Sequence, residues 1–417
     1  MNKILKFQLI FFVIICVFSI NLFAIENSEN SESVAVERFA LYVAANNGGK
    51  EREVLRYAAS DAEKLKNTMQ EIGGIDNKNS VILTEPNQVE VENALQEFAK
   101  KVNLAKQTSR RTEFIFYYSG HSDENALLLG EESFGYSQLK SAINSVPSDI
   151  HVVMLDSCFS GNFIRAKGGT RQKSFLVDES SIVSGHAYLS SSSESEASQE
   201  SDLIQSSFFT HALITGLRGA ADSSGDNKVS LNELYYYAFN ETLSQTEQST
   251  IGTQHPSFDI TLVGSGDLVL SDISTAESIL VLNSDLQGKI YIRNEDTKIL
   301  VSEIKKSAGN SIPLALPSGN YKVTMIQENQ TLEANAKLKS GRSVSLVAKK
   351  FKKVDTTDTR TRGGTFIPKE QPSSQENNDI YKDLPDSESA DKFFDLNNDM
   401  NDIRNNAMDA IKKLQKK

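Results

Sequence analysis

The sequence predicts a three-layer α/β/α sandwich with a mainly parallel sheet, followed by a small all-β sandwich and a mostly disordered tail. In the first part, short runs rich in aromatic and β-branched residues alternate with segments whose apolar residues recur at helical spacing. Near Asp267 the pattern changes to short strands with no helical segment between them, which indicates a β-sandwich. From Phe351 the chain is rich in Lys, Thr, Asn, Asp, Gln and Ser, a composition typical of disorder.

The elements of the first part follow in chain order. We expect strands over 39–45, 81–83, 114–118, 150–155 and 187–189, and helices over 62–72, 91–102, 139–146, 208–217 and 231–239. Asn87 and Glu90 can form a capping box at the start of the second helix. Strands 114–118 and 150–155, with a helix between them, form a right-handed βαβ unit, so both strands end at the same edge of the sheet.

The β-sandwich and the tail complete the expected organisation. The strands of the sandwich are predicted over 279–282, 289–293, 299–304, 312–316, 321–326 and 344–347, with a turn at Pro317 to Asn320. A stripe of apolar residues closes the chain and predicts either a solvated helix or a docking helix: Phe393, Leu396, Met400, Ile403, Ala407, Ile411 and Leu414. The expected boundaries are 1–24 signal peptide, 25–37 linker, 38–272 α/β domain, 275–350 β-sandwich and 351–417 low-complexity tail.

Charge and the N-terminus bear on partners and location. The formal net charge is −11 and the pI is about 5.2, which argues against a nucleic-acid partner. A basic start, an apolar run over 7–24 and a polar stretch after it are typical of a signal peptide cleaved after Ala24. The alternative is an uncleaved anchor. We therefore expect export to the periplasm, the cell surface or the medium. Cleavage would remove Cys16 and leave Cys158 as the single thiol.

Two strand ends carry reactive side chains. His121 follows strand 114–118 and Cys158 follows strand 150–155, so the topology predicts that the two residues emerge side by side. A thiol beside an imidazole is a nucleophile beside its base. The backbone amides of Ser122 and Cys158 would point into the same cleft, where they could stabilise an oxyanion. Five scattered histidines and one mature cysteine offer no zinc spacing.

At these residues the sequence resembles the caspase-like clan of cysteine peptidases, most closely its bacterial and metacaspase branch. The segments Tyr118-Ser119-Gly120-His121 and Asp156-Ser157-Cys158-Phe159-Ser160-Gly161 carry the likeness, together with 57–65, 207–219 and 254–256. It covers roughly residues 38–270. The resemblance implies that His121 is the general base or acid, Cys158 the nucleophile, and the amides of Ser122 and Cys158 the oxyanion hole.

The chain departs from its relatives at two points. Most relatives have glycine after the histidine, where this chain has Ser122. The Gln-Ala-Cys signature of animal caspases is absent, which argues against cleavage after Asp.

Asp156 lies two residues before the thiol and points to specificity. Along a strand its side chain falls on the same side as Cys158, where a carboxylate would attract a basic substrate side chain. In metacaspases an aspartate at this position lines the pocket for Arg or Lys, which the resemblance carries over to Asp156. The alternative is an Asp that caps the following helix, and both roles can hold at once. The Ser/Glu-rich segment 190–200 either flanks that pocket or is a solvated acidic loop.

A basic loop follows the nucleophile. It contains Arg165, Lys167, Arg171 and Lys173, and a peptidase that prefers basic residues could cut itself there. The alternative is an ordinary basic surface loop on an acidic chain.

A second candidate site resembles an EF-hand calcium loop. Its oxygen ligands would be Asp222, Ser224, Asp226, the Lys228 carbonyl, Ser230 and Glu233. Asn227 replaces the usual glycine but tolerates the left-handed conformation. No clear entering helix precedes the loop, because Gly216 and Gly219 interrupt the pattern. The alternative is a helix N-terminus capped by polar residues.

These features favour an exported cysteine endopeptidase that cleaves after Arg or Lys through an acyl-enzyme, needs no cofactor for the chemistry and acts on proteins or peptides. Calcium remains possible, and any membrane contact would be made through an uncleaved N-terminus. The main alternative is an inactive caspase-like protein that presents its β-sandwich to a partner or surface. A serine hydrolase is less well supported, since no Gly-x-Ser-x-Gly elbow precedes a helix.

Overall fold

The computed structural model describes residues 36–354, apart from 109–110, 166–183, 194–195, 248, 250, 264–266 and 328–329. The expected signal peptide, most of the basic loop, and residues 355–417 of the expected tail, with its apolar stripe, lie outside the described residues, whereas residues 351–354 are described. None of the described helices is long and apolar enough to cross a membrane.

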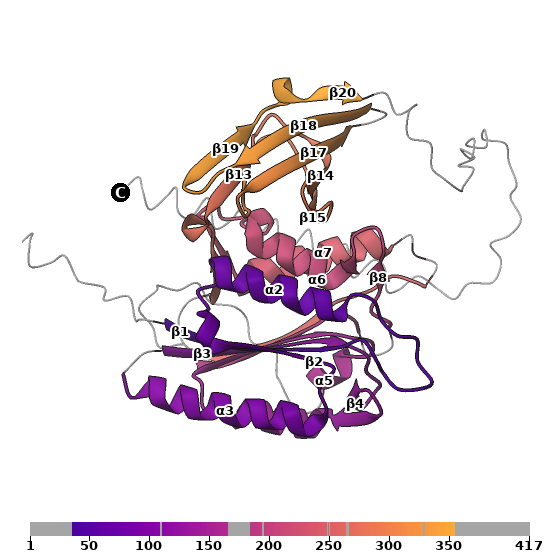
Figure 1. Ribbon diagram of the computed structural model, residues 1–417, viewed down its shortest axis with the longest axis vertical. Helices are drawn as coiled ribbons and strands as arrows, with labels where there is room; N and C mark the ends of the chain where they lie inside the picture. Colours follow the sequence, from indigo (N-terminus) through magenta and orange to yellow (C-terminus); the bar gives the residue numbers. More distant parts are fainter. Residues whose placement is uncertain are drawn as a thin grey trace, which may run out of the picture. The chain divides into compact units, whose positions relative to one another are not determined.

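The first part of the chain alternates strands and helices, as expected (Figure 1). Its helices are α2 (Ala58–Ile72), α3 (Gln88–Lys106), α4 (Tyr136–Asn144), α5 (Gly161–Arg165), α6 (Phe208–Thr215) and α7 (Leu231–Thr246). Its main strands are β1 (Val36–Ala45), β2 (Ser80–Thr84), β3 (Arg111–Gly120), β6 (Ile150–Asp156), β7 (Ser184–Ser190) and β11 (Ser257–Val263). Short pairs complete it: β4 (Ala126–Leu129) with β5 (Glu132–Gly135), β8 (Glu200–Ser201) with β9 (Ser206–Ser207), and β10 (Lys228–Ser230) with β12 (Val269–Asp272).

These main strands form one sheet in the order β11-β7-β6-β3-β1-β2. All neighbours run parallel except β11, which pairs antiparallel with β7 at one edge. In β1, Ala40, Tyr42 and Ala44 belong to one buried cluster, whereas Phe39, Leu41, Val43 and Ala45 belong to the other. Because both faces of the sheet are covered, the strand is apolar along its length rather than alternating.

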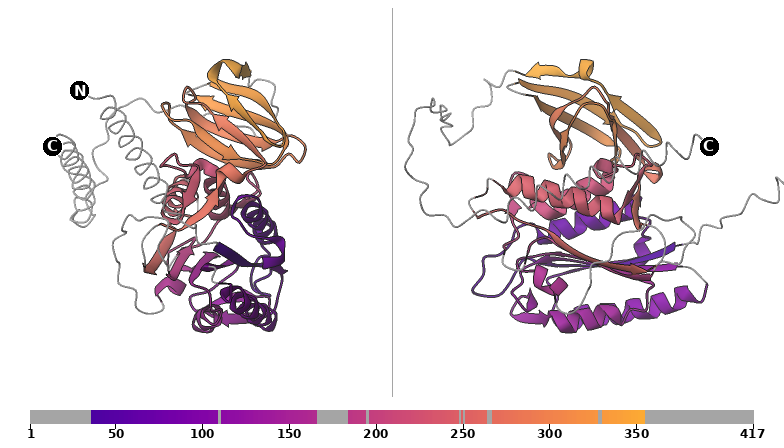
Figure 2. Two further views of the ribbon diagram at one scale, coloured as in Figure 1. Left: turned by 90° about the vertical axis from the view of Figure 1, so that its left-hand side faces the viewer. Right: turned by 180° about the vertical axis from the view of Figure 1, so that it is seen from behind.

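Helices cover both faces of this sheet, as Figures 1 and 2 show. Residues of α2, α6 and α7 share a core with one face, and residues of α3, α4 and α5 share a core with the other. The capping box at the start of α3 is present: the Asn87 side chain accepts from the Glu90 amide, and the Glu90 carboxylate accepts from the Asn87 amide. The three-layer α/β/α architecture is therefore confirmed.

The later part of the chain is all-β. Its strands are β13 (Ser278–Leu282), β14 (Gly288–Asn294), β15 (Leu300–Lys306), β16 (Ile312–Ala315), β17 (Gly319–Gln327), β18 (Gln330–Leu338), β19 (Arg342–Leu346) and β20 (Lys352–Val354). They form two sheets, β16-β13-β19 and β15-β14-β17-β18-β20, around a core of their own. The sequence pattern does not predict β18, because its inward residues include the small Ala334 and Ala336, which carry little hydrophobic signal.

Candidate active site

The sheet register brings the histidine and cysteine segments together. β3 and β6 are parallel neighbours, and their last paired residues are Ser119 and Asp156. His121 and Cys158 each lie two residues beyond that pair, at the same edge of the sheet. A direct contact joins the two segments, since the Ser122 hydroxyl donates to the Cys158 carbonyl oxygen. The expected juxtaposition of the two segments is therefore present.

The imidazole of His121 has a defined orientation. Its Nε2 lies 2.7 Å from the carbonyl oxygen of Glu53, and because a carbonyl can only accept, Nε2 carries a proton. In the neutral ring the lone pair is then on Nδ1. A Cβ on Gly48 would lie 2.5 Å from the ring carbons, so the loop after β1 approaches the imidazole too closely for any side chain. Burial lowers the pKa of His121, which favours the neutral ring.

Cys158 is a partly buried free thiol in the turn after β6. Burial raises its pKa, against the smaller opposing effects of a backbone hydrogen bond from Ser198 and the positive charge of Arg52. Both shifts favour the uncharged forms, the thiol of Cys158 and the neutral imidazole of His121. Such a thiol becomes a nucleophile when a base removes its proton, and the lone pair of His121 Nδ1 suits that task.

The hairpin β4–β5 directs the amide of Ser122. Ser122 pairs with Leu127, and the flanking bonds run from the Leu128 amide to His121 O at 2.9 Å and from the Asp123 amide to Ala126 O at 3.0 Å. In this non-hydrogen-bonded pair, the N–H of Ser122 points away from the hairpin. The orientation is compatible with an oxyanion donor, and the oxyanion role of Ser122 and Cys158 stays a prediction.

Asp156 lies at the end of β6 and is 2% exposed. Its carboxylate accepts hydrogen bonds from Ser198 Oγ at 2.7 Å, from Thr210 Oγ1 at 2.5 Å, and from the Ser207 hydroxyl. Ser207 is the N-cap of α6. The alternative in which Asp156 caps the following helix is therefore wrong as stated: its carboxylate contacts the N-terminus of α6, at the positive end of that helix dipole.

A second buried carboxylate, Asp61 on α2, escaped the sequence analysis. It accepts from Ser206 Oγ at 2.7 Å and from the Ser207 amide at 2.8 Å, and Lys64 Nζ lies 3.2 Å away. Burial, with a smaller contribution from the charge of Asp156, raises the pKa of Asp61 to about 7. Ser207 therefore touches both carboxylates, and the two acids belong to one hydrogen-bonded group.

The sequence does hold a signal for Asp61. It is a lone acidic residue within the apolar stripe Ala58, Ala62 and Leu65 of an amphipathic helix. A charged side chain on a buried face needs partners, and those partners point to a site.

The Ser/Glu-rich segment after β7 packs against the site rather than standing in solvent. The Glu200 carboxylate accepts from the amides of Arg56 and Tyr57, and Asp202 accepts from both of their side chains. These bonds hold the loop that carries Glu53, whose carbonyl orients His121. The role of this segment as a pocket wall stays a prediction.

The candidate calcium loop lies between the end of α6 and the start of α7. α6 continues through Gly216–Ala220, but Gly219 has φ +123°, which is not a helical conformation, so the helix is interrupted at Gly219 just before the loop, as expected, and not at Gly216. Asn227 adopts φ +65°, the left-handed conformation expected there. The Asp222 carboxylate accepts from the Gly225 and Asn227 amides, and Glu233 accepts from the Ser223 and Ser224 amides.

Glu233 also forms a capping box with Ser230 at the start of α7, so the capped N-terminus is present. Throughout the described part of the chain, no three His, Cys, Asp or Glu side chains are grouped to hold a metal ion. Calcium binding by this loop stays a prediction.

The described residues include only the start of the basic loop. Arg165 is the last residue of α5, and Lys167, Arg171 and Lys173 lie outside the described residues. Self-cleavage there is likewise untested.

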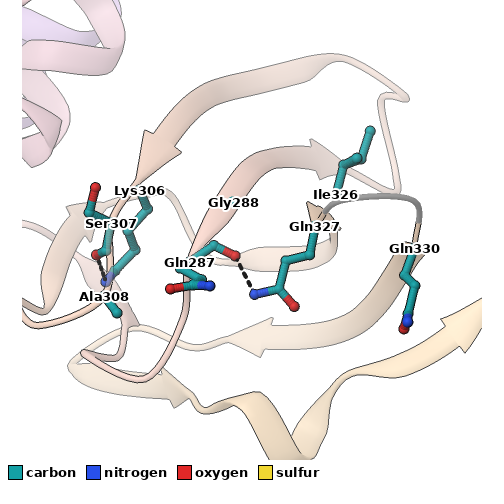
Figure 3. Close-up of a pocket in the computed structure, with 8 residues that line it drawn as sticks. All are labelled: Gln287, Gly288, Lys306, Ser307, Ala308, Ile326, Gln327 and Gln330. Atoms are coloured by element: carbon teal, nitrogen blue, oxygen red, sulfur yellow. Dashed lines mark hydrogen bonds between the residues drawn. The ribbon is translucent and has the colours of Figure 1, made fainter.

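A cavity of about 420 Å³ lies in the β-sandwich, well apart in sequence from the Cys158 and His121 segments (Figure 3). It is lined by Gln287, Gly288, Lys306, Ser307, Ala308, Ile326, Gln327 and Gln330. The Lys306 ammonium donates to the carbonyls of Leu286, Ser307 and Asn310, and Gln327 donates to the Gln287 carbonyl. These polar groups hold loops together, and the residues that line the cavity include neither a cysteine nor a histidine.

Comparison with known proteins gives one positive finding. No curated protein matches the chain. The model of the caspase domain family matches residues 37–264, which is more than half of the 417 residues and includes β1, β3, β6 and the turns that carry His121 and Cys158. The chain therefore belongs to the caspase domain family of peptidases.

Proposed function

We propose that the chain is an exported endopeptidase in which Cys158 and His121 form the catalytic dyad and which cleaves after Arg or Lys. Its membership in the caspase domain family supports this proposal, because the family indicates a cysteine peptidase that acts on protein or peptide substrates. The observation that carries the dyad is the fixed tautomer of His121 at the sheet edge shared with Cys158. Export rests on the N-terminal sequence alone.

The proposed reaction follows from that tautomer. His121 Nδ1 takes the thiol proton while Sγ attacks the substrate carbonyl carbon, and the carbonyl oxygen becomes an oxyanion held by the Ser122 and Cys158 amides. The imidazolium then gives its proton to the departing amine as the C–N bond breaks, which leaves an acyl-enzyme. A water molecule, deprotonated by Nδ1, attacks the acyl carbon, and the proton returns to Sγ as the C–S bond breaks. The Glu53 carbonyl keeps Nε2 protonated throughout.

The preference for basic residues rests on two carboxylates. Asp156 and Asp61 are both buried next to the nucleophile segment and share Ser207 as a donor. Lys64, which lies beside Asp61, offsets part of this charge. A guanidinium or ammonium group would be stabilised by the remaining negative charge, since charge-assisted pairs are strong in a desolvated site. An acidic substrate side chain would be repelled.

The test is turnover of matched peptide reporters with Arg, Lys or Asp before the cleaved bond. We expect turnover of the Arg and Lys reporters, none of the Asp reporter, and loss of activity in Cys158→Ala and His121→Ala. His186→Ala is the matched control, because His186 lies near the start of β7, paired with His151, at the other end of the sheet from Cys158.

Two results would contradict the proposal. Activity that survives in Cys158→Ala would exclude the cysteine mechanism. A folded wild-type protein that cleaves none of the reporters would favour the alternative of an inactive binding protein.

A further inference from the structure

The peptide that joins Cys158 to Phe159 is held at both of its polar atoms. Its carbonyl oxygen, that of Cys158, accepts from the Ser122 hydroxyl. Its N–H, that of Phe159, donates to the carbonyl of Glu196 at 3.0 Å. Ser122 is fully buried, so its hydroxyl has no water to exchange with. One side chain from the histidine segment and one carbonyl from the segment after β7 therefore determine the plane of this peptide.

This peptide needs such support, because the turn after the nucleophile is strained. Phe159 has φ +54°, in the left-handed region that bulky residues avoid. A residue of this kind persists in that conformation only where its surroundings hold it there. Without the Ser122 hydroxyl, this peptide keeps only its bond to the Glu196 carbonyl, so it is freer to rotate toward a more relaxed conformation, and Cys158 moves with it.

The preceding peptide is already fixed by other groups. The Ser157 carbonyl accepts from the hydroxyls of Ser160 at 2.7 Å, Ser192 at 3.0 Å and Ser191 at 3.2 Å. Because a peptide is planar and trans, a fixed Ser157 oxygen also fixes the direction of the Cys158 N–H. The remaining main-chain freedom at Cys158 is the rotation of the next peptide, which Ser122 and the Glu196 carbonyl restrain together.

Ser122 also connects the two proposed oxyanion donors. Its own N–H points away from the β4–β5 hairpin, while its hydroxyl is bonded to the residue that supplies the other N–H. A change in this single contact therefore changes the spacing between the two donors.

We propose that Ser122 is a positioning residue, whose hydroxyl holds the Cys158–Phe159 peptide and thereby sets the place of the thiol and the spacing of the oxyanion donors. The inference rests on the proposed peptidase function. It assigns to the side chain of Ser122 a role separate from that of its amide. The Ser122 side chain acts on the reaction rather than on substrate binding, because its hydroxyl is turned to the Cys158 carbonyl.

The experiment compares Ser122→Ala, which removes the hydroxyl, with Ser122→Thr, which keeps it. Ser145→Ala is the matched control, since the Ser145 hydroxyl likewise donates to a main-chain carbonyl, that of Ala142, but at the end of α4. Each protein is assayed for kcat and KM on the Arg reporter, for thermal unfolding, and for the rate of Cys158 alkylation by iodoacetamide.

We expect kcat of Ser122→Ala to fall by about tenfold to a hundredfold with KM unchanged, less than the loss of a whole oxyanion donor. Ser122→Thr should recover most of the rate, and alkylation should slow in Ser122→Ala alone. A wild-type kcat in Ser122→Ala, or a loss confined to KM, would overturn the inference. The inference would also be overturned if kcat fell equally in the Ala and Thr variants, in proportion to their loss of thermal stability.

Failure of the proposed function looks different. In that case wild-type protein turns over no reporter, and the alkylation rates of Cys158 in the same variants decide the inference on their own. Slower alkylation in Ser122→Ala than in wild type and Ser145→Ala would support it, and equal rates would reject it.

Discussion

Replacing Asp156 by asparagine tests the specificity proposal with little change of shape. The carboxylate accepts three side-chain hydrogen bonds, from Ser198, Ser207 and Thr210. An alanine would leave these buried hydroxyls without their acceptor, at about 1–3 kcal/mol for each group left unpaired. A loss of activity in Asp156→Ala would then be hard to separate from a loss of structure. Asn keeps one acceptor oxygen and removes the charge.

The expected size of the effect follows from the loss of a desolvated charge pair. Truncating one partner of such a pair costs about 2–5 kcal/mol, and about 3 kcal/mol corresponds to a fall of roughly a hundredfold in kcat/KM for the Arg reporter. Burial raises the pKa of Asp61 to about 7, so at pH 6 most Asp61 side chains are protonated and uncharged in the wild type. In the variant the pKa of Asp61 falls, because the neighbouring charge is gone, and Asp61 compensates in part. The measured loss is therefore a lower bound on the contribution of Asp156.

The assay is kcat/KM at pH 6 on two reporters that differ only in Arg or norleucine before the cleaved bond, with thermal unfolding measured in parallel. We expect the loss on the Arg reporter alone, with a small change in thermal stability. An Asp156→Asn protein that keeps its Arg preference, or that loses both reporters equally, would refute the assignment of Asp156 to specificity.

Three further predictions follow from the described contacts and the sequence. Because burial raises the pKa of Asp61 from 3.8 to about 7, the folded state holds its proton more tightly, so the contribution of Asp61 to the free energy of unfolding is largest below about pH 4 and falls as pH rises through 7, by at most ~4 kcal/mol. In urea unfolding, the free energy of unfolding should fall more between pH 5 and pH 8 in the wild type than in Asp61→Asn. An equal fall in the two proteins would contradict the prediction. Calcium should raise the midpoint of thermal unfolding of the wild type and not that of Glu233→Gln. A calcium titration that releases no heat of binding and leaves the midpoint unchanged would exclude the site. Purified protein should split between Arg165 and Lys173 while Cys158→Ala stays whole, and mass spectra that place the cuts elsewhere would rule out self-processing.

Much of the fold was predictable because its signals are local. Buried parallel strands must be apolar on both faces, so β1, β3 and β6 are visible as continuous runs, and the helices between them show their buried stripes. Parallel strands end at one sheet edge, so the strand pattern alone predicts that the His121 and Cys158 segments meet there. Among the elements that the sequence pattern did not predict, the β4–β5 hairpin is short and β18 carries small inward residues, and their pairing depends on neighbours rather than on hydrophobic pattern.

The sequence by itself determined the layered class of the fold and singled out His121 and Cys158 as candidate catalytic residues, because periodicity indicates buried strands and helices and residue type indicates chemistry. Only the tertiary structure decided how those residues are held. The Glu53 carbonyl that orients His121 is a backbone atom, and every residue has one, so no residue type marks it. Asp61 is 145 positions from the Ser206 that binds it, and Ser122 is 36 positions from the carbonyl it holds. A buried polar group is stable only with its partners, and when these come from distant segments, folding alone brings them together.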